Sequence, residues 1–296
     1  MHYEEWGAGD PIIALHPLAL ESSAFEGLGR ALAQRGLRTL AADLPGFGQT
    51  PAPEAPLTPA RLAEPVLELA RTLERPPLLF GMSMGGRVAL EVALMDPDAV
   101  RGVVLVAPFL PLRRWRRAHG VVRGLDPGWA EHLPLERAWP LLKRLAEILE
   151  GRPSLEQDWL ARASIRFVYY ISCPATRVAF LSAARGMALD PAFGPRGTWT
   201  RLASLGVPAT FLWAGRDAII PSVHASHVAE LLPSAGQVEI PCSGHFVSGK
   251  HFLCMQHAML LAVERTLEPD GEPSTLAPCL ADAPGASAQP AGGVSA

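Results

Sequence analysis

The sequence predicts an α/β protein with a doubly wound, mostly parallel sheet and an inserted helical cap. Short apolar or β-branched runs, bounded by Gly, Pro or Asp, alternate with segments in which apolar residues recur every three or four positions. This alternation is typical of strands and helices in turn, and it predicts helices on both faces of a parallel sheet. The alternation stops after Pro108 and resumes at Ala209. Only helix-like segments lie between, so we expect an insertion over one edge of the sheet.

The strands and helices can be assigned in chain order. The apolar runs are brief, which favours buried strands over helices. Thr58 and Pro59 supply an N-cap and a proline at the first helical position, so a helix is expected to begin there. We expect strands at 12–15, 37–42, 78–80, 103–106, 209–213 and 237–240, and helices at 22–34, 58–74 and 84–95.

The chain divides into a core, an insertion and a tail. Residues 1–107 and 197–267 carry the strand pattern and form the expected core, while residues 108–196 form the expected helical cap or lid. Residues 268–296 are dominated by proline and small residues, with almost nothing to bury. Such a composition cannot offset the entropy of ordering the chain, so we expect a disordered tail.

Composition argues against several classes of protein. The 296 residues are 49% hydrophobic and 19% charged, which is enough apolar material for a large core. A formal net charge of -3 gives no general attraction to nucleic acid or anionic membrane, and no apolar stretch approaches the ~20 residues of a spanning helix. The acidic start lacks the features of a signal peptide. We expect a cytoplasmic protein without metal or other cofactor, whose thiols are free because no metal or disulfide spacing relates Cys173, Cys242, Cys254 and Cys279.

Residues 78–90 read LLFGMSMGGRVAL, an apolar strand followed by a Gly-x-Ser-x-Gly turn and the start of a helix. The pattern alone is weak, but this context is that of a nucleophile elbow. Gly81 and Gly85 are needed there because side chains would collide with the neighbouring strand and helix. The turn pushes Ser83 above the sheet at a helix N-terminus, where free N–H groups favour a developing oxyanion. The alternative is an ordinary glycine-rich turn.

The chain resembles the α/β-hydrolase family over roughly residues 10–265. ADLPGFGQT at 42–50 is similar to the family's loop after an early strand, and GMSMGG at 81–86 to its nucleophile elbow. LWAGRDAIIP at 212–221 is similar to the turn that carries the family's acid, and CSGHF at 242–246 to its histidine loop. The family's chain order of Ser, Asp and His implies that Ser83, Asp217 and His245 form a catalytic triad.

The chemistry of acyl transfer explains these residue types. A serine hydroxyl is a poor nucleophile at neutral pH, so His245 must take its proton during attack and return it to the leaving group. Asp217 would hold the histidine tautomer and stabilise the imidazolium; the alternative is an aspartate that caps its turn. The other histidines lie in expected helices or outside any motif and are weaker candidates.

The resemblance also implies an oxyanion hole. One donor would be the N–H of Met84, the residue after the nucleophile. The second would come from the loop after an early strand, where the family usually has His-Gly-x and this chain has His-Pro-Leu at 16–18. Proline has no N–H, so Leu18 takes the donor role by position, with Ala19 as the alternative. We expect His16 to stabilise the loop rather than to act in catalysis.

The expected cap would set substrate choice. Trp139 and Trp159 in the cap, together with Phe246 after the triad histidine, are our candidates for substrate contact. Such aromatic residues favour a small substrate with acyl or aromatic character, although each can equally belong to the core of the cap. The basic run RRWRRAHGVVR at 113–123 is better interpreted as a solvated helix face than as a nucleic-acid patch.

We therefore expect a cofactor-free serine hydrolase that cleaves a small carboxylic ester or lactone through an acyl-enzyme. HPLALESSAF beside GMSMGG is most similar to small esterases and enol-lactonases. The alternatives are a carbon–carbon bond hydrolase or acyltransferase with the same triad, and a ligand-binding relative without catalysis. Serine at the elbow argues against dehalogenases and epoxide hydrolases, which have aspartate there, and Phe246 argues against many carbon–carbon bond hydrolases, which have tryptophan. Whether the protein is a monomer or a homodimer stays open.

Overall fold

A seven-stranded sheet in the order β1-β3-β2-β4-β5-β6-β7 organises the chain. The structure is a computed structural model that describes residues 1–111, 168–170, 172–217, 219–220, 223–240, 243–245 and 250–267. β1 pairs antiparallel with β3, and the other neighbouring pairs are parallel. The doubly wound, mostly parallel sheet expected from the sequence is confirmed. The strands are β1 Tyr3–Trp6, β2 Asp10–Leu15, β3 Leu37–Ala42, β4 Leu78–Met82, β5 Gly102–Val106, β6 Ala209–Ala214 and β7 Gly236–Ile240.

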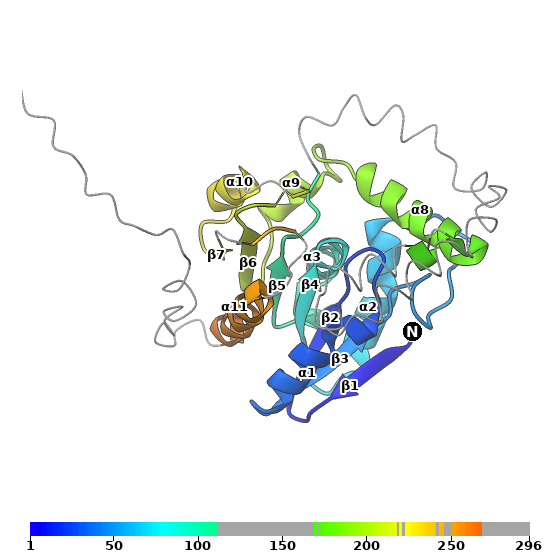
Figure 1. Cartoon of the computed structure of the whole chain (residues 1–296). Coiled ribbons are helices and arrows are strands. Elements are labelled where there is room, and N and C mark those ends of the chain that lie inside the picture. Colours follow the sequence, from blue (N-terminus) through cyan, green and yellow to red (C-terminus); the bar gives the residue numbers. More distant parts are fainter. Residues whose placement is uncertain are drawn as a thin grey trace, which may run out of the picture.

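Helices cover both faces of the sheet (Figure 1). α1 and α11 pack against one face, while α2, α3, α8, α9 and α10 contribute to the cluster on the other. The described helices are η1 Ser22–Phe25, α1 Glu26–Ala33, α2 Pro59–Thr72, α3 Met84–Met95, η2 Pro97–Ala99, α8 Pro174–Ala188, α9 Thr198–Leu202, α10 Val223–Leu231 and α11 Lys250–Leu267.

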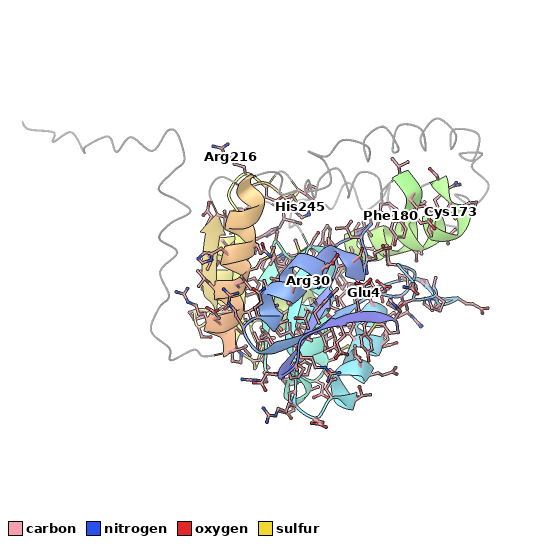
Figure 2. All side chains as sticks on the ribbon, turned by 60° about the horizontal axis from the view of Figure 1, so that its bottom comes forward. Glu4, Arg30, Cys173, Phe180, Arg216 and His245 are labelled. Carbon is pink, nitrogen blue, oxygen red and sulfur yellow. The ribbon has the colours of Figure 1, made fainter. Side chains whose placement is uncertain are left out.

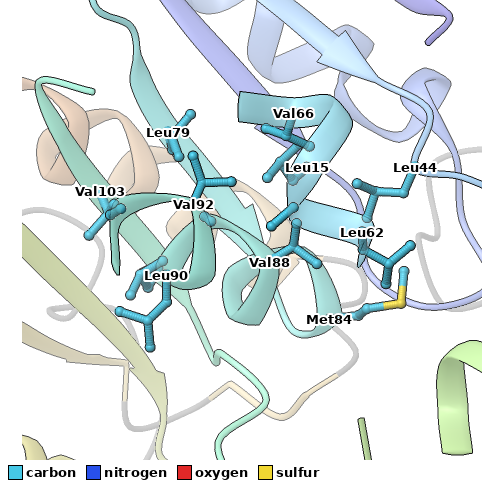
Figure 3. Packing of buried hydrophobic residues seen from close by; sticks show 14 of the residues in the cluster. Leu15, Leu44, Leu62, Val66, Leu79, Met84, Val88, Leu90, Val92 and Val103 are labelled. Atoms are coloured by element: carbon cyan, nitrogen blue, oxygen red, sulfur yellow. The ribbon is translucent and has the colours of Figure 1, made fainter. Parts of the chain in front are cut away.

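Alternation along the strands supplies both hydrophobic cores. Successive side chains of a strand point to opposite faces, so Leu79 of β4 joins the cluster around α2 and α3, and Phe80 joins the cluster around α1 and α11. Figure 3 shows part of the larger cluster, in which Leu15 of β2, Leu62 of α2 and Val88 of α3 are buried with Leu79. The turn between β4 and α3 therefore joins two elements whose residues are mostly buried.

The sequence predicts some ends of helices and strands correctly but not others. Thr58 caps α2 by accepting a hydrogen bond from the N–H of Arg61 at 3.3 Å, and Pro59 is the first helical residue, as expected. The helix expected at 22–34 instead begins as a 3-10 turn, η1, before α1. The sequence does not predict β1, because YEEW is acidic and its residues alternate between exposed and half-buried rather than forming an apolar run. This strand lies at the edge of the sheet and is formed by pairing with β3.

Part of the expected cap is described. α8, which Figure 1 shows beside α2, buries Ala179, Ala183 and Met187 in the same cluster as α2 and α3. The approach is close, because Ser182 Oγ accepts a hydrogen bond from the N–H of Leu57 at 3.0 Å. The boundaries of the cap at 108–196 and of the tail at 268–296 stay predictions. Residues 112–167 and the tail lie outside the described residues.

Membrane spans and metal clusters can be assessed in the described ranges. None of the helices there is long and apolar enough to cross a membrane. Within the same ranges, no group of three or more His, Cys, Asp or Glu side chains is placed to hold a metal ion.

Candidate active site

Ser83 occupies the sharp turn between β4 and α3. Its φ of 50° and ψ of -110° form a strained backbone conformation that residues other than glycine rarely adopt. Its N–H donates to the carbonyl of Val106 at 2.9 Å, and its own carbonyl accepts from the N–H groups of Arg87 at 3.1 Å and Phe109 at 2.9 Å. The strained turn is therefore held from β5, from the loop after β5 and from α3.

The backbone around Ser83 leaves no room for side chains at Gly81 and Gly85. A Cβ on Gly85 would overlap the carbonyl of Leu15 at the end of β2. A Cβ on Gly81 would overlap the carbonyl of Gly85 in the first turn of α3. The collisions expected from the sequence are confirmed, and they explain why the strand, the turn and the helix can approach so closely.

Asp217 and His245 lie on loops that follow the adjacent strands β6 and β7. The N–H of Arg216 donates to the carbonyl of Ser243 at 2.9 Å, which links the two loops directly. One carboxylate oxygen of Asp217, Oδ1, accepts from the backbone N–H groups of residues 219–220 at 2.8 and 2.7 Å. The turn thus fixes the carboxylate and leaves Oδ2 for the histidine.

The three residues implied as a triad come together. His245 Nδ1 lies 2.8 Å from Asp217 Oδ2, and Nε2 lies 3.2 Å from Ser83 Oγ. The Asp217 side chain is fully buried, and that of His245 is 9% exposed. A carboxylate only accepts, so Nδ1–H donates to Asp217 and the Nε2 lone pair faces the Ser83 hydroxyl. Figure 2 shows His245 on the same side of the fold as Phe180 of α8.

The two expected oxyanion donors come from two different segments. Met84 is the first residue of α3, and Leu18 lies in the loop after β2. Between described residues, no hydrogen bond uses either N–H group. The loop is a tight turn in which Leu20 N–H donates to the Pro17 carbonyl at 3.2 Å and Ala19 takes a φ of 65°. Met84 and Leu18 therefore stay the candidate donors.

His16 holds this loop against the end of β3. The ring is fully buried; Nδ1–H donates to the carbonyl of Pro17 at 2.9 Å, and Nε2 accepts from the N–H of Leu44 at 3.0 Å. Burial lowers the pKa of His16 to about 4, so the ring stays neutral at neutral pH. Because both ring nitrogens are used in this way, the geometry is that of a loop-stabilising residue.

Two contributions around Ser83 have no clear signal in the sequence. Ala107 has a φ of 40°, and the chain after it turns so that the N–H of Phe109 reaches the Ser83 carbonyl. The side chain of Arg87 is only 1% exposed, although it is charged. An arginine and a glutamate within the otherwise apolar helix α3 are the feature that could have drawn attention to it. The expected substrate contacts Trp139, Trp159 and Phe246 lie outside the described residues.

Comparison with known proteins identifies the family. A sequence model of the alpha/beta hydrolase fold matches residues 10–252. The chain belongs to the α/β-hydrolase family. This α/β-hydrolase is 30% identical over 249 residues to the pimeloyl-[acyl-carrier protein] methyl ester esterase of Chromobacterium violaceum, an alignment that covers 82% of this chain and 89% of that relative.

Solved structures are similar over most of this α/β-hydrolase. A thermophilic esterase from Thermogutta terrifontis has a TM-score of 0.63 and 24% identity, with 90% of this chain and 93% of that chain covered. The enol-lactonase from Burkholderia xenovorans has a TM-score of 0.62 and 20% identity, with 89% and 95% covered. At these identities the likeness shows the fold alone. The fold and family expected from the sequence are confirmed, and the protein is an enzyme of this family.

Proposed function

We propose that this α/β-hydrolase is a serine hydrolase that cleaves a small carboxylic ester or lactone through an acyl-enzyme intermediate. The observation that carries the proposal is the continuous relay from Asp217 through His245 to Ser83, with contacts of 2.8 and 3.2 Å. The strained turn and the helix N-terminus at Ser83 support it. The methyl ester esterase relative supports an ester as substrate.

The first half-reaction forms the acyl-enzyme. Ser83 Oγ attacks the substrate carbonyl carbon while His245 Nε2 takes the hydroxyl proton, and Asp217 stabilises the resulting imidazolium. The charge that develops on the carbonyl oxygen would be met by the N–H groups of Met84 and Leu18. When the carbonyl re-forms, the bond to the alcohol oxygen breaks and His245 gives that oxygen its proton. In a lactone, the freed alcohol stays attached to the acyl group.

The second half-reaction releases the acid. A water molecule takes the place of the alcohol, and His245 Nε2 accepts its proton as the oxygen attacks the acyl carbon. The same two N–H groups would meet the second oxyanion. Collapse breaks the bond to Ser83 Oγ, and His245 returns the proton to the serine. Neither step requires a group beyond the protein and water.

The proposal is tested by turnover of nitrophenyl esters of increasing acyl length and of simple lactones. The wild-type protein should hydrolyse at least one series, and Ser83→Ala should lose at least about 1,000-fold in kcat while its circular dichroism spectrum stays unchanged. Full activity in Ser83→Ala, or no turnover of any ester or lactone by the wild type, would contradict the proposal. Cleavage of a diketone but of no ester would instead favour carbon–carbon bond hydrolysis.

A further inference from the structure

A buried charge network surrounds Arg87, in the helix that begins directly after Ser83. Arg87 Nε and Nη2 donate to the two carboxylate oxygens of Asp190 at 2.7 and 3.2 Å, and Nη1 donates to Glu91 Oε2 at 2.8 Å. Arg201 Nη1 donates to the other oxygen of Glu91 at 2.7 Å. Thr198 Oγ1 donates to Asp190 Oδ2 at 2.6 Å. The guanidinium of Arg87 is thus hydrogen-bonded to the carboxylates of both Asp190 and Glu91.

The network joins elements that are distant in the chain. Arg87 and Glu91 belong to α3, Asp190 follows α8, and Thr198 and Arg201 belong to α9. The positive and negative charges balance, and only Arg201 reaches solvent appreciably, at 26% side-chain exposure. Although burial raises the pKa of Glu91, the charges of Arg87 and Arg201 outweigh it and hold that pKa below its usual value. The carboxylate therefore stays ionised and paired.

Stability alone does not account for such a network. Taking charges out of water is costly, and apolar side chains of similar volume often serve a fold equally well or better. A cation in the first turn of α3 also opposes the helix macrodipole. What a bidentate arginine–carboxylate pair provides is fixed direction, because both partners are planar and held by parallel hydrogen bonds.

The clamped residue also holds the nucleophile. The backbone N–H of Arg87 donates to the carbonyl of Ser83 at 3.1 Å. We propose that Arg87 is a positioning residue: its pairing with Asp190 fixes the first turn of α3, and with it the direction of Ser83 Oγ and the N–H of Met84. The consequence for turnover rests on the proposed serine hydrolase function.

Loss of the clamp should show in the chemical step. A displacement of about 1 Å at a reacting group can cost about 100-fold in rate. The contact from His245 Nε2 to Ser83 Oγ is already 3.2 Å long, so a shift of α3 weakens proton transfer directly. We expect kcat to fall about 10- to 100-fold, with KM changed less than about threefold, because the displaced groups, Ser83 Oγ and the N–H of Met84, act on the reacting carbonyl.

The test removes the network without leaving an unpaired buried charge. Arg87→Met alone would leave the buried carboxylate of Asp190 without a cationic partner and Glu91 with Arg201 only, which can prevent folding. The main variant is therefore Arg87→Met/Glu91→Met/Asp190→Leu, which replaces the charges by apolar groups and leaves Arg201 to water. Asp190→Asn, which keeps the shape of the side chain, is the second variant. Both should fold and both should show the loss of kcat, although the triple variant leaves the buried Thr198 hydroxyl without its acceptor and should melt below the wild type for that reason.

Two further readouts separate positioning from stability and from the proposed function. Hydrogen exchange in the first turn of α3 should accelerate in both variants, a measurement that needs no turnover. Thr266→Val is the matched control: it breaks the buried hydrogen bond of 2.7 Å between Thr210 Oγ1 and Thr266 Oγ1, and it should lower the melting temperature with kcat unchanged. Wild-type kcat or wild-type exchange in either folded variant overturns the positioning role. An inactive wild type with faster exchange in the variants overturns only the proposed function.

Discussion

Replacing His224 with phenylalanine should stabilise the protein, and more strongly in acid than at neutral pH. His224 lies on α10 with 2% exposure, and neither ring nitrogen has a hydrogen-bond partner among the residues that the structure describes. Its ring packs against Trp199, with centroids 5.3 Å apart, and lies 6.4 Å from the ring of His227. Burial, followed by the charge of His227, lowers the pKa of His224 to about 4. The ring is therefore a buried polar group that the fold leaves unpaired.

The gain at neutral pH comes from removing the unpaired nitrogens. A buried donor or acceptor without a partner costs about 1–3 kcal/mol. Phenylalanine keeps a ring against Trp199 and has no polar atom to satisfy. We expect His224→Phe to raise the free energy of unfolding by about 1–3 kcal/mol at pH 8.

The additional gain in acid follows from proton binding by the unfolded chain. The pKa of His224 is about 4 when folded and 6.5 when unperturbed. Between these pH values the unfolded chain binds a proton that the folded protein does not, so the wild type loses stability as the pH falls from 6.5 toward 4. At pH 5 the loss is about 1.4 kcal/mol per unit over about 1.5 units, or about 2 kcal/mol. Phenylalanine does not titrate, so the variant escapes this loss.

Urea unfolding of the wild type and of His224→Phe at pH 8 and pH 5 measures both effects. The stability difference should grow by about 2 kcal/mol at the lower pH, or by about 4–8 °C in melting temperature for a domain of this size. Val223→Phe, at an exposed position on the same helix, is the control for simply adding an aromatic ring. A difference that is the same at both pH values would refute the reasoning. Overpacking cannot imitate the result, because its cost does not depend on pH.

Three other groups of variants test the site and its surroundings. Ser83→Ala and His245→Ala should each remove nearly all turnover, and the double variant should be little worse than either. Asp217→Asn should retain more activity than these variants. If the double variant instead loses kcat by the product of the two single losses, the residues act independently. His16→Phe leaves the Pro17 carbonyl and the Leu44 N–H unpaired and should lower the free energy of unfolding by about 2–4 kcal/mol in urea, so an unchanged value would contradict the loop-holding role. Trp139→Ala and Trp159→Ala should change acyl-length preference more than melting temperature; loss of folding with unchanged preference would show that the cap does not select substrate.

The sequence could predict the elbow because its constraints are local. The glycines on either side of Ser83 report a backbone that passes too close for side chains, and this is what the Cβ collisions at Gly81 and Gly85 show. The cap of α2 at Thr58 was equally visible because it depends on a residue three positions away. Asp217 and His245 were placed by the resemblance to a family, since nothing local tells a triad member from a turn residue.

The buried polar groups could not be predicted because their partners are distant in the chain. Arg87 and Glu91, spaced one helical turn apart, have the pattern of an exposed ion pair on a helix surface. Their burial depends on Asp190 and Arg201, which reach α3 only in the folded protein. His224 gives no signal either, because a histidine in an expected helix does not reveal that its ring will lack partners.

The most direct test of the central claim is covalent labelling by a fluorophosphonate, followed by intact-mass spectrometry and peptide mapping. The relay from Asp217 through His245 should make Ser83 Oγ the one nucleophile that reacts, giving a single adduct on that residue. Labelling should be absent in Ser83→Ala and much slower in His245→Ala, because the base that removes the hydroxyl proton is gone. No adduct on the folded wild-type protein, or an adduct at any other residue, would contradict the assignment of Ser83 as the nucleophile.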